Sequence, residues 1–518
     1  MSAPPASPTR DPAAAPLNVR WALLGVMLAM LLSMLDNMVV GTAMPTIVGD
    51  LGGLEHISWV VTAYTLATAA STPAWGKFGD LYGRKHMYLA SVAVFVLGSA
   101  LSGAAQSMTQ LIVFRAVQGL GAGGIGAGAF ALIATLVPPR ERGRYQGMTA
   151  SVMAIGTVGG PLLGGFITGH IGWRWAFYVN LPLGLIALVW CQLMLRLPAR
   201  RTKARIDWLG ITLMTATICA FVLAATWAGT TYAWSSWQIN GLFVLAVLGV
   251  AAFIASQKRA AEPVLPLRVF TGHRNFPLAN ALIAAAGVVM FGCALYLPLY
   301  QQTVQGASAT SSGLLLLPMM IPVVLASQIG GKVMSATGKY KIFPVLGAAC
   351  MAIGLFLLST MDTTTSRTAT GCYMVLVGIG LGCQMQMVTT IAQNSVETGD
   401  MGAASASVNL FRTIGGSLGI AVFGSLFTRA VRHHTPATGA AAEGAQPDAA
   451  SLAHLPKAAK DAYLHAVTNG THHIFLTAAI VCAAAFVAAL CVKEVPLRGK
   501  PGAAPTTHNT ATVPANAR

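Results

Sequence analysis

The chain has 518 residues, of which 55% are hydrophobic and only 9% are charged, and its formal net charge is +17. A soluble protein of this length would carry far more charge, so the composition excludes a soluble globular protein. Apolar runs of about 20 residues recur along the chain, and each can cross a ~30 Å hydrocarbon layer as a helix. The sequence therefore predicts an all-α polytopic membrane protein.

The predicted elements begin after a tail, residues 1–20, that is rich in Pro and Ala and is predicted to be disordered. Six spans fill 21–195, two more fill 207–257, and six fill 277–492, with a long outer loop at 429–473. A second disordered tail is predicted at 493–518. The fourteen spans are 21–42, 58–76, 87–106, 110–134, 145–169, 175–195, 207–228, 239–257, 277–300, 313–334, 343–361, 370–392, 405–428 and 474–492.

Positive residues indicate the orientation. Most of the 32 lysines and arginines fall between spans on one side, in segments such as GKFGDLYGRK, PPRERGR and RLPARRTKAR. Segments of this kind stay on the cytoplasmic side of the membrane. Because the number of spans is even, both termini are predicted to be cytoplasmic and the protein to reside in the cell (inner) membrane. This asymmetry accounts for the net charge without a nucleic-acid partner.

Histidines and cysteines give no metal or disulfide framework. Histidine is the commonest metal ligand, but adjacent side chains on a helix do not face each other. A surface segment with a short helix is therefore favoured over a metal site in the outer loop. The eight cysteines stand singly, mostly in apolar runs, which is typical of small packing residues. The outer loop holds six of the eleven histidines: His433, His434, His454, His465, His472 and His473.

An internal repeat relates the first six spans to the last six. GKFGDLYGRK, from Gly76, matches GKVMSATGKY, from Gly331, and TVGGPLLG matches TIGGSLGI at nearly the same offset. A glycine ladder in span 110–134 likewise matches one in span 370–392. Matches at one offset indicate a repeat more strongly than any single match. Two parallel six-helix halves are the architecture of major facilitator transporters, so the sequence predicts two such bundles plus two inserted helices.

Motifs carry a more specific resemblance. The sequence resembles the major facilitator superfamily, and within it the fourteen-helix drug:proton antiporter branch (EmrB/QacA-type). LDNMVVGTAMP, RAVQGLGAG and GWRWAFYVNLPLG are similar to motifs of this branch. The loop signature of the superfamily is matched at Gly76, Asp80, Gly83, Arg84 and Lys85. The helix 5 signature of exporters, GxxxGPxxGG, is matched at Gly156, Gly160, Pro161, Gly164 and Gly165.

The resemblance implies a conformational gate and an antiporter motif, and the residues support both. Asp80 and Arg84 stand four apart at helix ends, where they can pair or cap a neighbouring helix and stabilise one of two rocking states. The glycines of the helix 5 motif form a flat face that can seal one half against its partner. The alternatives are a solvated topogenic loop and a tight helix crossing without a transport role.

Asp36 is the one acid, of 15, that lies deep within a predicted span. Such a residue costs roughly 2.5–3.5 kcal/mol on insertion scales and is a functional candidate by default. Asp36 lies ~22 Å from the inner face, counted from Trp21 at 1.5 Å per residue, and Arg115 has a similar depth. We predict that the two form a proton-coupling pair that takes up a proton outside and releases it inside. A structural salt bridge is the alternative.

A substrate cavity between the halves is also predicted. Apolar, aromatic and Met-rich surfaces can repack around varied ligands. Packing in the core is the alternative role for these side chains. The candidate lining residues are Phe291, Tyr296, Tyr300, Gln384, Met385 and Arg412.

The predicted function is proton-coupled efflux of hydrophobic or amphipathic compounds by alternating access. The resemblance to the drug:proton antiporter branch implies a multidrug transporter. An exporter of a specific lipid or native metabolite, and a non-transporting receptor or sensor, remain as alternatives. No enzyme motif is found, so the protein is expected to be a secondary active transporter. It would use the proton gradient and no cofactor. Its expected partners are small-molecule substrates, protons, the lipid bilayer and, by family analogy, a periplasmic adaptor.

Overall fold

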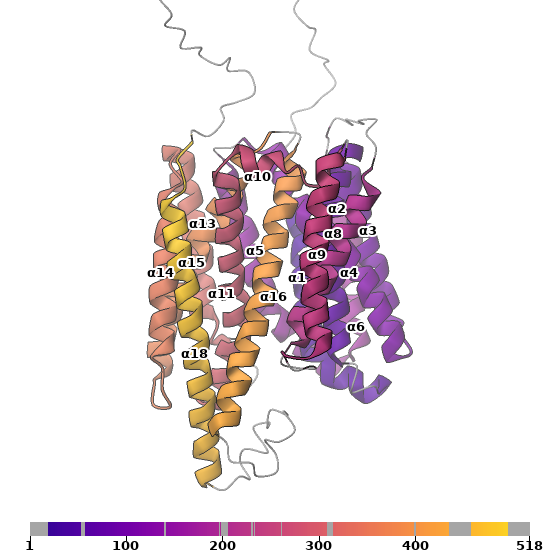
Figure 1. Ribbon diagram of the computed structural model, residues 1–518. Helices are drawn as coiled ribbons and strands as arrows, with labels where there is room; N and C mark the ends of the chain where they lie inside the picture. The colour runs from indigo at the N-terminus through magenta and orange to yellow at the C-terminus, as the bar shows by residue number, and fades with distance from the viewer. Residues whose placement is uncertain are drawn as a thin grey trace, which may run out of the picture.

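The computed structural model describes residues 19–52, 57–138, 141–195, 197, 206–228, 232, 234–260, 262–307, 314–397, 400–434 and 457–495. Within these ranges the named elements are all helices, and most of them run side by side (Figure 1). The first group consists of α1 (Val19–Leu51), α2 (Ile57–Tyr82), α3 (Arg84–Gly103), α4 (Met108–Leu136), α5 (Arg142–His170), α6 (Arg174–Tyr178) and α7 (Asn180–Met194).

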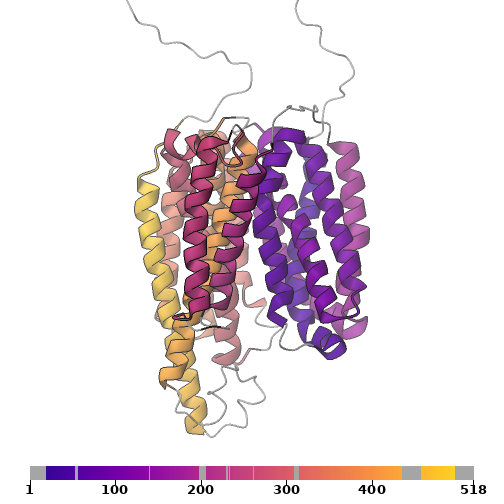
Figure 2. The same cartoon turned by 45° about the vertical axis from the view of Figure 1, so that its right-hand side comes forward.

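Three further helices connect this group to a second one. They are α8 (Trp208–Trp227), α9 (Trp237–Arg259) and the short α10 (Arg268–Gly272). The second group consists of α11 (Asn275–Thr303), α13 (Leu317–Thr337), α14 (Ile342–Ser359), α15 (Arg367–Asn394), α16 (Met401–His434) and α18 (Lys457–Leu490). Figure 2 shows the first group, in indigo to purple, beside the second group, whose colours run from rose through orange to yellow.

Twelve segments of the described chain are helical, long and apolar enough to cross a membrane. The combined α6–α7 segment is one of them. Helices α2 and α5 are not among the twelve, although their 26 and 29 residues correspond to ~40 Å of helix. The predicted class, an all-α polytopic membrane protein, is confirmed, and the count of fourteen spans stays a prediction.

Local sequence sets several helix ends. Ser107, Asp207 and Ser366 each accept a hydrogen bond from a backbone N–H in the first turn of α4, α8 and α15. Gly83 separates α2 from α3 with a φ of 99°, a left-handed conformation that favours glycine. Its counterpart in the repeat, Gly338, ends α13 with a φ of 72°. The segment GKFGDLYGRK, expected as a loop, is therefore helical on both sides of Gly83.

The packing of the two groups follows the repeat. In the first group α2 and α3 pack on α4, and α1 packs on α5 and α7. In the second group α13 and α14 pack on α15, and α11 packs on α16 and α18. The groups meet where α5 contacts α13 and α2 contacts α16, two contacts that the repeat also relates. We therefore call α1–α7 the first half and α11–α18 the second half.

The inserted helices lie against the seam between the halves. Helix α8 contacts α9, α2 of the first half and α16 of the second. Its buried Met214, Ile218 and Val222 join one apolar cluster with Ala69 and Leu410. Gln257 of α9 donates a hydrogen bond to the Asp207 carboxylate (2.6 Å) and so links the two inserted helices.

Predicted tails and the outer loop are described only in part. Residues 1–18, 435–456 and 496–518 lie outside the described residues, and so do the predictions that fall on them. In the outer segment predicted as a loop, α16 continues to His434 and α18 already begins at Lys457. Both helices therefore extend well beyond the predicted spans. His472 Nδ1 donates a hydrogen bond to the Ser359 carbonyl (2.6 Å).

Candidate functional site

Asp36 lies at the centre of a buried polar cluster in the first half. Its side chain and that of Arg115 are both fully buried, and Arg115 Nη1 lies 2.5 Å from Asp36 Oδ2. Two amides complete the set of donors: Gln118 Nε2 (2.8 Å) and Asn180 Nδ2 (2.7 Å) both donate to Asp36 Oδ1. Every partner of the carboxylate is a donor, which is the arrangement that an ionised carboxylate requires. The structure thus brings together the two residues that the sequence pairs.

The arginine is held from several sides. Arg115 Nη1 also donates to Gln118 Oε1 (2.9 Å), and the guanidinium carbon lies 4.1 Å from the centre of the Tyr64 ring. This is the geometry of a cation–π interaction, which is strongest where water is excluded. Within the described residues Arg115 Nε and Nη2 have no hydrogen-bond acceptor. The Tyr64 hydroxyl lies 3.1 Å from Ser33 Oγ, so Tyr64 also contacts α1.

Sequence reasoning missed Gln118, Asn180 and Tyr64. Gln118 follows Arg115 by three residues, which places both on one face of α4 and offers a usable signal. Asn180 is an isolated amide at the start of an apolar span and offers a weaker one. Tyr64 resembles any core tyrosine in the sequence. The cluster therefore draws on α1, α2, α4 and α7, and it ties four helices of the first half to one carboxylate.

The helix 5 motif packs directly beside this cluster. A Cβ at Gly160 would lie 2.3 Å from Met38 Cβ, and a Cβ at Gly156 would lie 2.7 Å from Met34 Cβ. These two methionines flank Asp36 on α1, so the glycine face of α5 holds the helix that carries the acid. A Cβ at Gly165, by contrast, would have no atom within 4 Å. Gly164 is buried, and the side chain of Pro161 lies outside the described residues.

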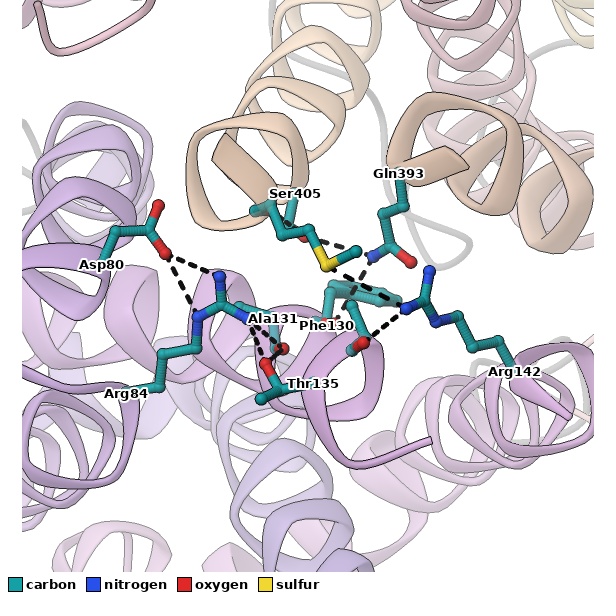
Figure 3. A network of polar contacts seen from close by, with 10 residues as sticks. Asp80, Arg84, Phe130, Ala131, Thr135, Arg142, Gln393 and Ser405 are labelled. Carbon is teal, nitrogen blue, oxygen red and sulfur yellow. Dashed lines mark hydrogen bonds and ion pairs between the residues drawn. The ribbon is translucent and has the colours of Figure 1, made fainter. Parts of the chain in front are cut away.

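The residues of the predicted gate lie at the end of the bundle where α10 lies (Figure 1), which we call the α10 end. Arg84 donates to Asp80 Oδ1 through Nη2 (2.8 Å) and Nε (3.1 Å). It also donates to the Ala131 carbonyl (3.3 Å) and to Thr135 Oγ1 of α4. Figure 3 shows this arginine between α2 and α4. The predicted pair of Asp80 and Arg84 is therefore present.

Asp80 also reaches across to the second half. Its carboxylate accepts a hydrogen bond from the backbone N–H of Ala403, in the first turn of α16. A helix N-terminus attracts negative charge, so this contact stabilises the joined arrangement. A Cβ at Gly76 would lie 2.8 Å from Ala406 Cβ and 3.0 Å from the Gly402 carbonyl oxygen. Glycine at position 76 is therefore what lets α2 approach α16.

Further polar contacts join the halves at the same end. Arg142 Nη2 donates to the Ala134 carbonyl (2.6 Å) and lies 4.0 Å from Met401 Sδ of α16. Gln393 of α15 donates to Ser405 Oγ (3.1 Å) and to the Phe130 carbonyl of α4 (3.4 Å). Figure 3 shows both residues near the start of α16. Sequence reasoning did not single out Arg142 or Gln393, because neither stands in a recognised motif.

Two lysines beside Asp80 and Arg84 contact neighbouring segments. Lys77 pairs with Glu262 (3.2 Å), after α9, and Lys85 donates to the Gln192 carbonyl of α7 (2.8 Å). In the second copy of the motif Ser335 stands where the first has Asp80, and its hydroxyl donates to the Gly331 carbonyl (2.8 Å) in the same helix. The acid-based contact thus belongs to the first copy.

The predicted cavity residues mostly pack inside the second half. Tyr296 stacks edge-on against Phe423, with 6.2 Å between ring centres, and the Tyr300 hydroxyl donates to the Asp362 carbonyl (2.6 Å). Gln384 is fully buried and donates to the Leu282 carbonyl (3.1 Å).

The other three cavity candidates differ in their surroundings. Phe291 lies against Gly416, where a Cβ would come within 2.3 Å of its ring, and Met385 packs partly buried against the core of the second half. Arg412 donates from Nη2 to Asn409 Oδ1. A role for these six residues in substrate binding stays a prediction. A cavity of about 220 Å³ lies elsewhere, at the α10 end between Arg274, Asn394 and Lys493.

Histidine, cysteine and carboxylate side chains are the candidate metal ligands of the described residues. Among them no group of three or more His, Cys, Asp or Glu side chains is arranged to hold a metal ion. His433, His434, His465, His472 and His473 belong to α16 and α18, whereas His454 lies outside the described residues.

These features define a class of protein. Two repeat-related helical halves meet at the α10 end, a buried ion pair lies within the first half, and glycine-lined crossings join its helices. Such an arrangement is that of a polytopic membrane transporter built from two related bundles.

Comparison with known proteins gives the family. The model of the Major Facilitator Superfamily matches residues 26–420. An uncharacterized MFS-type transporter of Mycobacterium tuberculosis (strain CDC 1551 / Oshkosh) is 39% identical over 96% of this chain and 72% of its own. Multidrug resistance protein 3 of Bacillus subtilis (strain 168) is 34% identical over 89% of this chain and 93% of its own. The chain belongs to the major facilitator superfamily, and it is a multi-pass secondary transporter rather than an enzyme.

A solved structure supports the fold. The human organic anion transporter MFSD10 superposes with a TM-score of 0.59 over 90% of this chain and 99% of its own. At 12% sequence identity this similarity concerns the fold alone.

Proposed function

We propose that this transporter exports amphipathic, mostly apolar compounds in exchange for protons. The observation that carries the proposal is the Asp36 cluster, a fully buried carboxylate paired with Arg115 inside the membrane layer. An intramembrane acid is expensive to bury, and in transporters such residues mark ion pathways. The multidrug name of the Bacillus relative supports the export of varied compounds.

The coupling would work through α5. Because its glycines Gly156 and Gly160 lie against the methionines that flank Asp36, a movement of α5 along α1 changes the surroundings of the carboxylate. In one state Asp36 is paired with Arg115, as in the structure described. In the other, the pair opens and the carboxylate takes a proton. The exchange uses the proton gradient and requires no cofactor.

The orientation belongs to the same proposal. The described basic residues Lys77, Arg84 and Arg142 lie at the α10 end. By the positive-inside rule that end, and with it both termini, would be cytoplasmic, with the protein in the cell membrane. The contacts of Asp80 and Gly76 with α16 would then close the cytoplasmic side. Protons, lipid and small-molecule substrates are the proposed partners, with an adaptor protein where a second membrane has to be crossed.

Efflux from intact cells tests the proposal. Cells that express the full chain are loaded with a panel of amphipathic dyes, and dye loss is followed with and without a proton uncoupler. We expect uncoupler-sensitive efflux that is lost in Asp36→Asn. Asp50→Asn is the matched control, because Asp50 lies on the same helix in an exposed pair with Arg174 (3.4 Å). Efflux that survives both the uncoupler and Asp36→Asn at the wild-type rate would overturn the proposal.

A further inference from the structure

Arg412 is a second arginine within the membrane layer, and its charge is handled differently from that of Arg115. It lies eleven residues into α16, which is ~17 Å along the helix at 1.5 Å per residue. This is close to the middle of the candidate span Met401–Phe427 and of a ~30 Å hydrocarbon core. Substrate sites of transporters with two related halves lie at this depth.

The side chain of Arg412 lies toward the first half. Asn409, one turn earlier on α16, accepts a hydrogen bond from Arg412 Nη2. Asn409 in turn faces α4, because a Cβ at Gly126 of α4 would lie 3.3 Å from Asn409 Nδ2. The backbone of Arg412 faces α11 instead, since its carbonyl oxygen would lie 2.2 Å from a Cβ at Gly287. The guanidinium is thus directed to the region between the halves and away from α11.

No acid neutralises this guanidinium among the described residues. Its one polar side-chain partner there is the neutral amide of Asn409. Asp36, the acid deep in a span, is already paired with Arg115. Asp80 lies at the α10 end, where it contacts Gly402 of α16. Gly402 stands ten residues before Arg412, which is ~15 Å along the helix. The deep charges of the bundle therefore leave one positive charge in excess.

An unpaired cation in the membrane layer is costly, so it calls for a counter-charge. A guanidinium carries five donors in a planar fork that fits a carboxylate or sulfonate with two parallel hydrogen bonds. Arg412 uses one nitrogen toward Asn409 and is partly exposed, so donors remain for a ligand. The amide of Asn409 adds a neutral polar group beside them.

We propose that Arg412, with Asn409, binds the anionic group of amphipathic organic acids, and that such acids are a substrate class of this transporter. The inference rests on the proposed export function and names the charge of its substrates. Binding of the acid would neutralise the guanidinium, while the apolar part of the ligand would remain between the two halves.

Binding to the purified full-length protein tests the site independently of transport. The probes are 1-pyrenebutyrate and its neutral counterpart 1-pyrenebutanol, and binding is read as energy transfer from the ten tryptophans to pyrene. We expect the wild-type protein to bind the carboxylate at least about tenfold more tightly than the alcohol, the usual effect of a charge-assisted hydrogen bond. Equal affinities in the wild-type protein would overturn the proposal without any variant.

Substitutions then assign the selectivity to one residue. Arg412→Met should remove the preference for the carboxylate and change alcohol binding less than about threefold, whereas Arg412→Lys should keep part of the preference. Arg429→Met is the matched control, an exposed arginine on the same helix, and it should behave as the wild type. If Arg412→Met still prefers the carboxylate over the alcohol as strongly as the wild type does, the proposal is contradicted. It is also contradicted if Arg412→Lys loses affinity equally for the carboxylate and for the alcohol.

The outcome can be separated from that of the export proposal. Selective acid binding by a protein that shows no uncoupler-sensitive efflux would refute export and leave the site in place. Uncoupler-sensitive dye efflux by a protein that binds the acid and the alcohol equally would refute the site and leave export in place.

Discussion

Removing the charge of Asp36 gives the sharpest prediction of the structure. In Asp36→Asn the Oδ2 atom that accepts from Arg115 at 2.5 Å, or the Oδ1 atom that accepts from Gln118 and Asn180, becomes a donor. A donor then faces a donor, and the buried charge of Arg115 is left without a counter-charge. Breaking a buried pair in this way costs about 3–5 kcal/mol.

The double variant Asp36→Asn/Arg115→Met removes both charges. It should recover much of the lost stability, with a coupling free energy on the order of 2 kcal/mol between the two positions. The free energy of unfolding of purified protein in detergent, measured for the four members of the cycle, checks this. Additive effects would refute the pair as an energetic unit.

Transport separates a structural pair from a coupling pair. If the pair served packing alone, the double variant would regain efflux together with stability. We expect it to remain inactive in uncoupler-sensitive dye efflux, because no carboxylate is left to carry a proton. Proton-coupled efflux at the wild-type rate in the stable double variant would refute our reasoning.

Three further changes give independent expectations. Asp80→Asn weakens the contact with the first turn of α16 and should shift the balance between conformations by roughly tenfold, with little change in substrate Kd. Distances between spectroscopic labels on the two halves measure the shift, and unchanged distances together with a large loss of substrate binding would contradict the gate. Gly160→Ala should impair folding or transport, because its Cβ would lie 2.3 Å from Met38 Cβ, whereas Gly165→Ala should not, because a Cβ there has open space. Equal expression and equal efflux of the two variants would contradict the close crossing of α5 and α1. Asn180→Leu removes one donor to Asp36 and should cost about 1–3 kcal/mol of unfolding free energy, so an unchanged value would argue against the hydrogen bond.

Much of the candidate site follows from depth along the chain. A lone acid in an apolar span must find a donor, and Arg115 is the arginine at matching depth in the same half, so the pair could be predicted. Gln118 offered only its spacing from Arg115 as a signal, and Asn180 could not be predicted, because an amide in a membrane span has a smaller desolvation cost and therefore no comparable need for a particular partner. Asp80 and Arg84 are close in sequence, and their pairing required only helical spacing.

The contacts between the two halves could not be predicted from the sequence. The close approach of Gly76 to Gly402 joins residues more than 300 positions apart in the sequence. The repeat identified corresponding helices but not their mutual contacts. Helix lengths were also underestimated, since α16 and α18 continue past their apolar segments with Ala-rich, partly polar residues that hydropathy does not mark as helix.

Proton movement in a reconstituted system tests the central claim most directly. The full-length protein is placed in liposomes that contain a pH-sensitive dye, a pH gradient is imposed, and an amphipathic substrate is added on one side. We predict that substrate addition triggers proton flux in the wild-type protein, and that Asp36→Asn binds the same substrate but moves no protons. Substrate transport without proton flux in the wild-type protein, or undiminished proton flux in Asp36→Asn, would contradict the account.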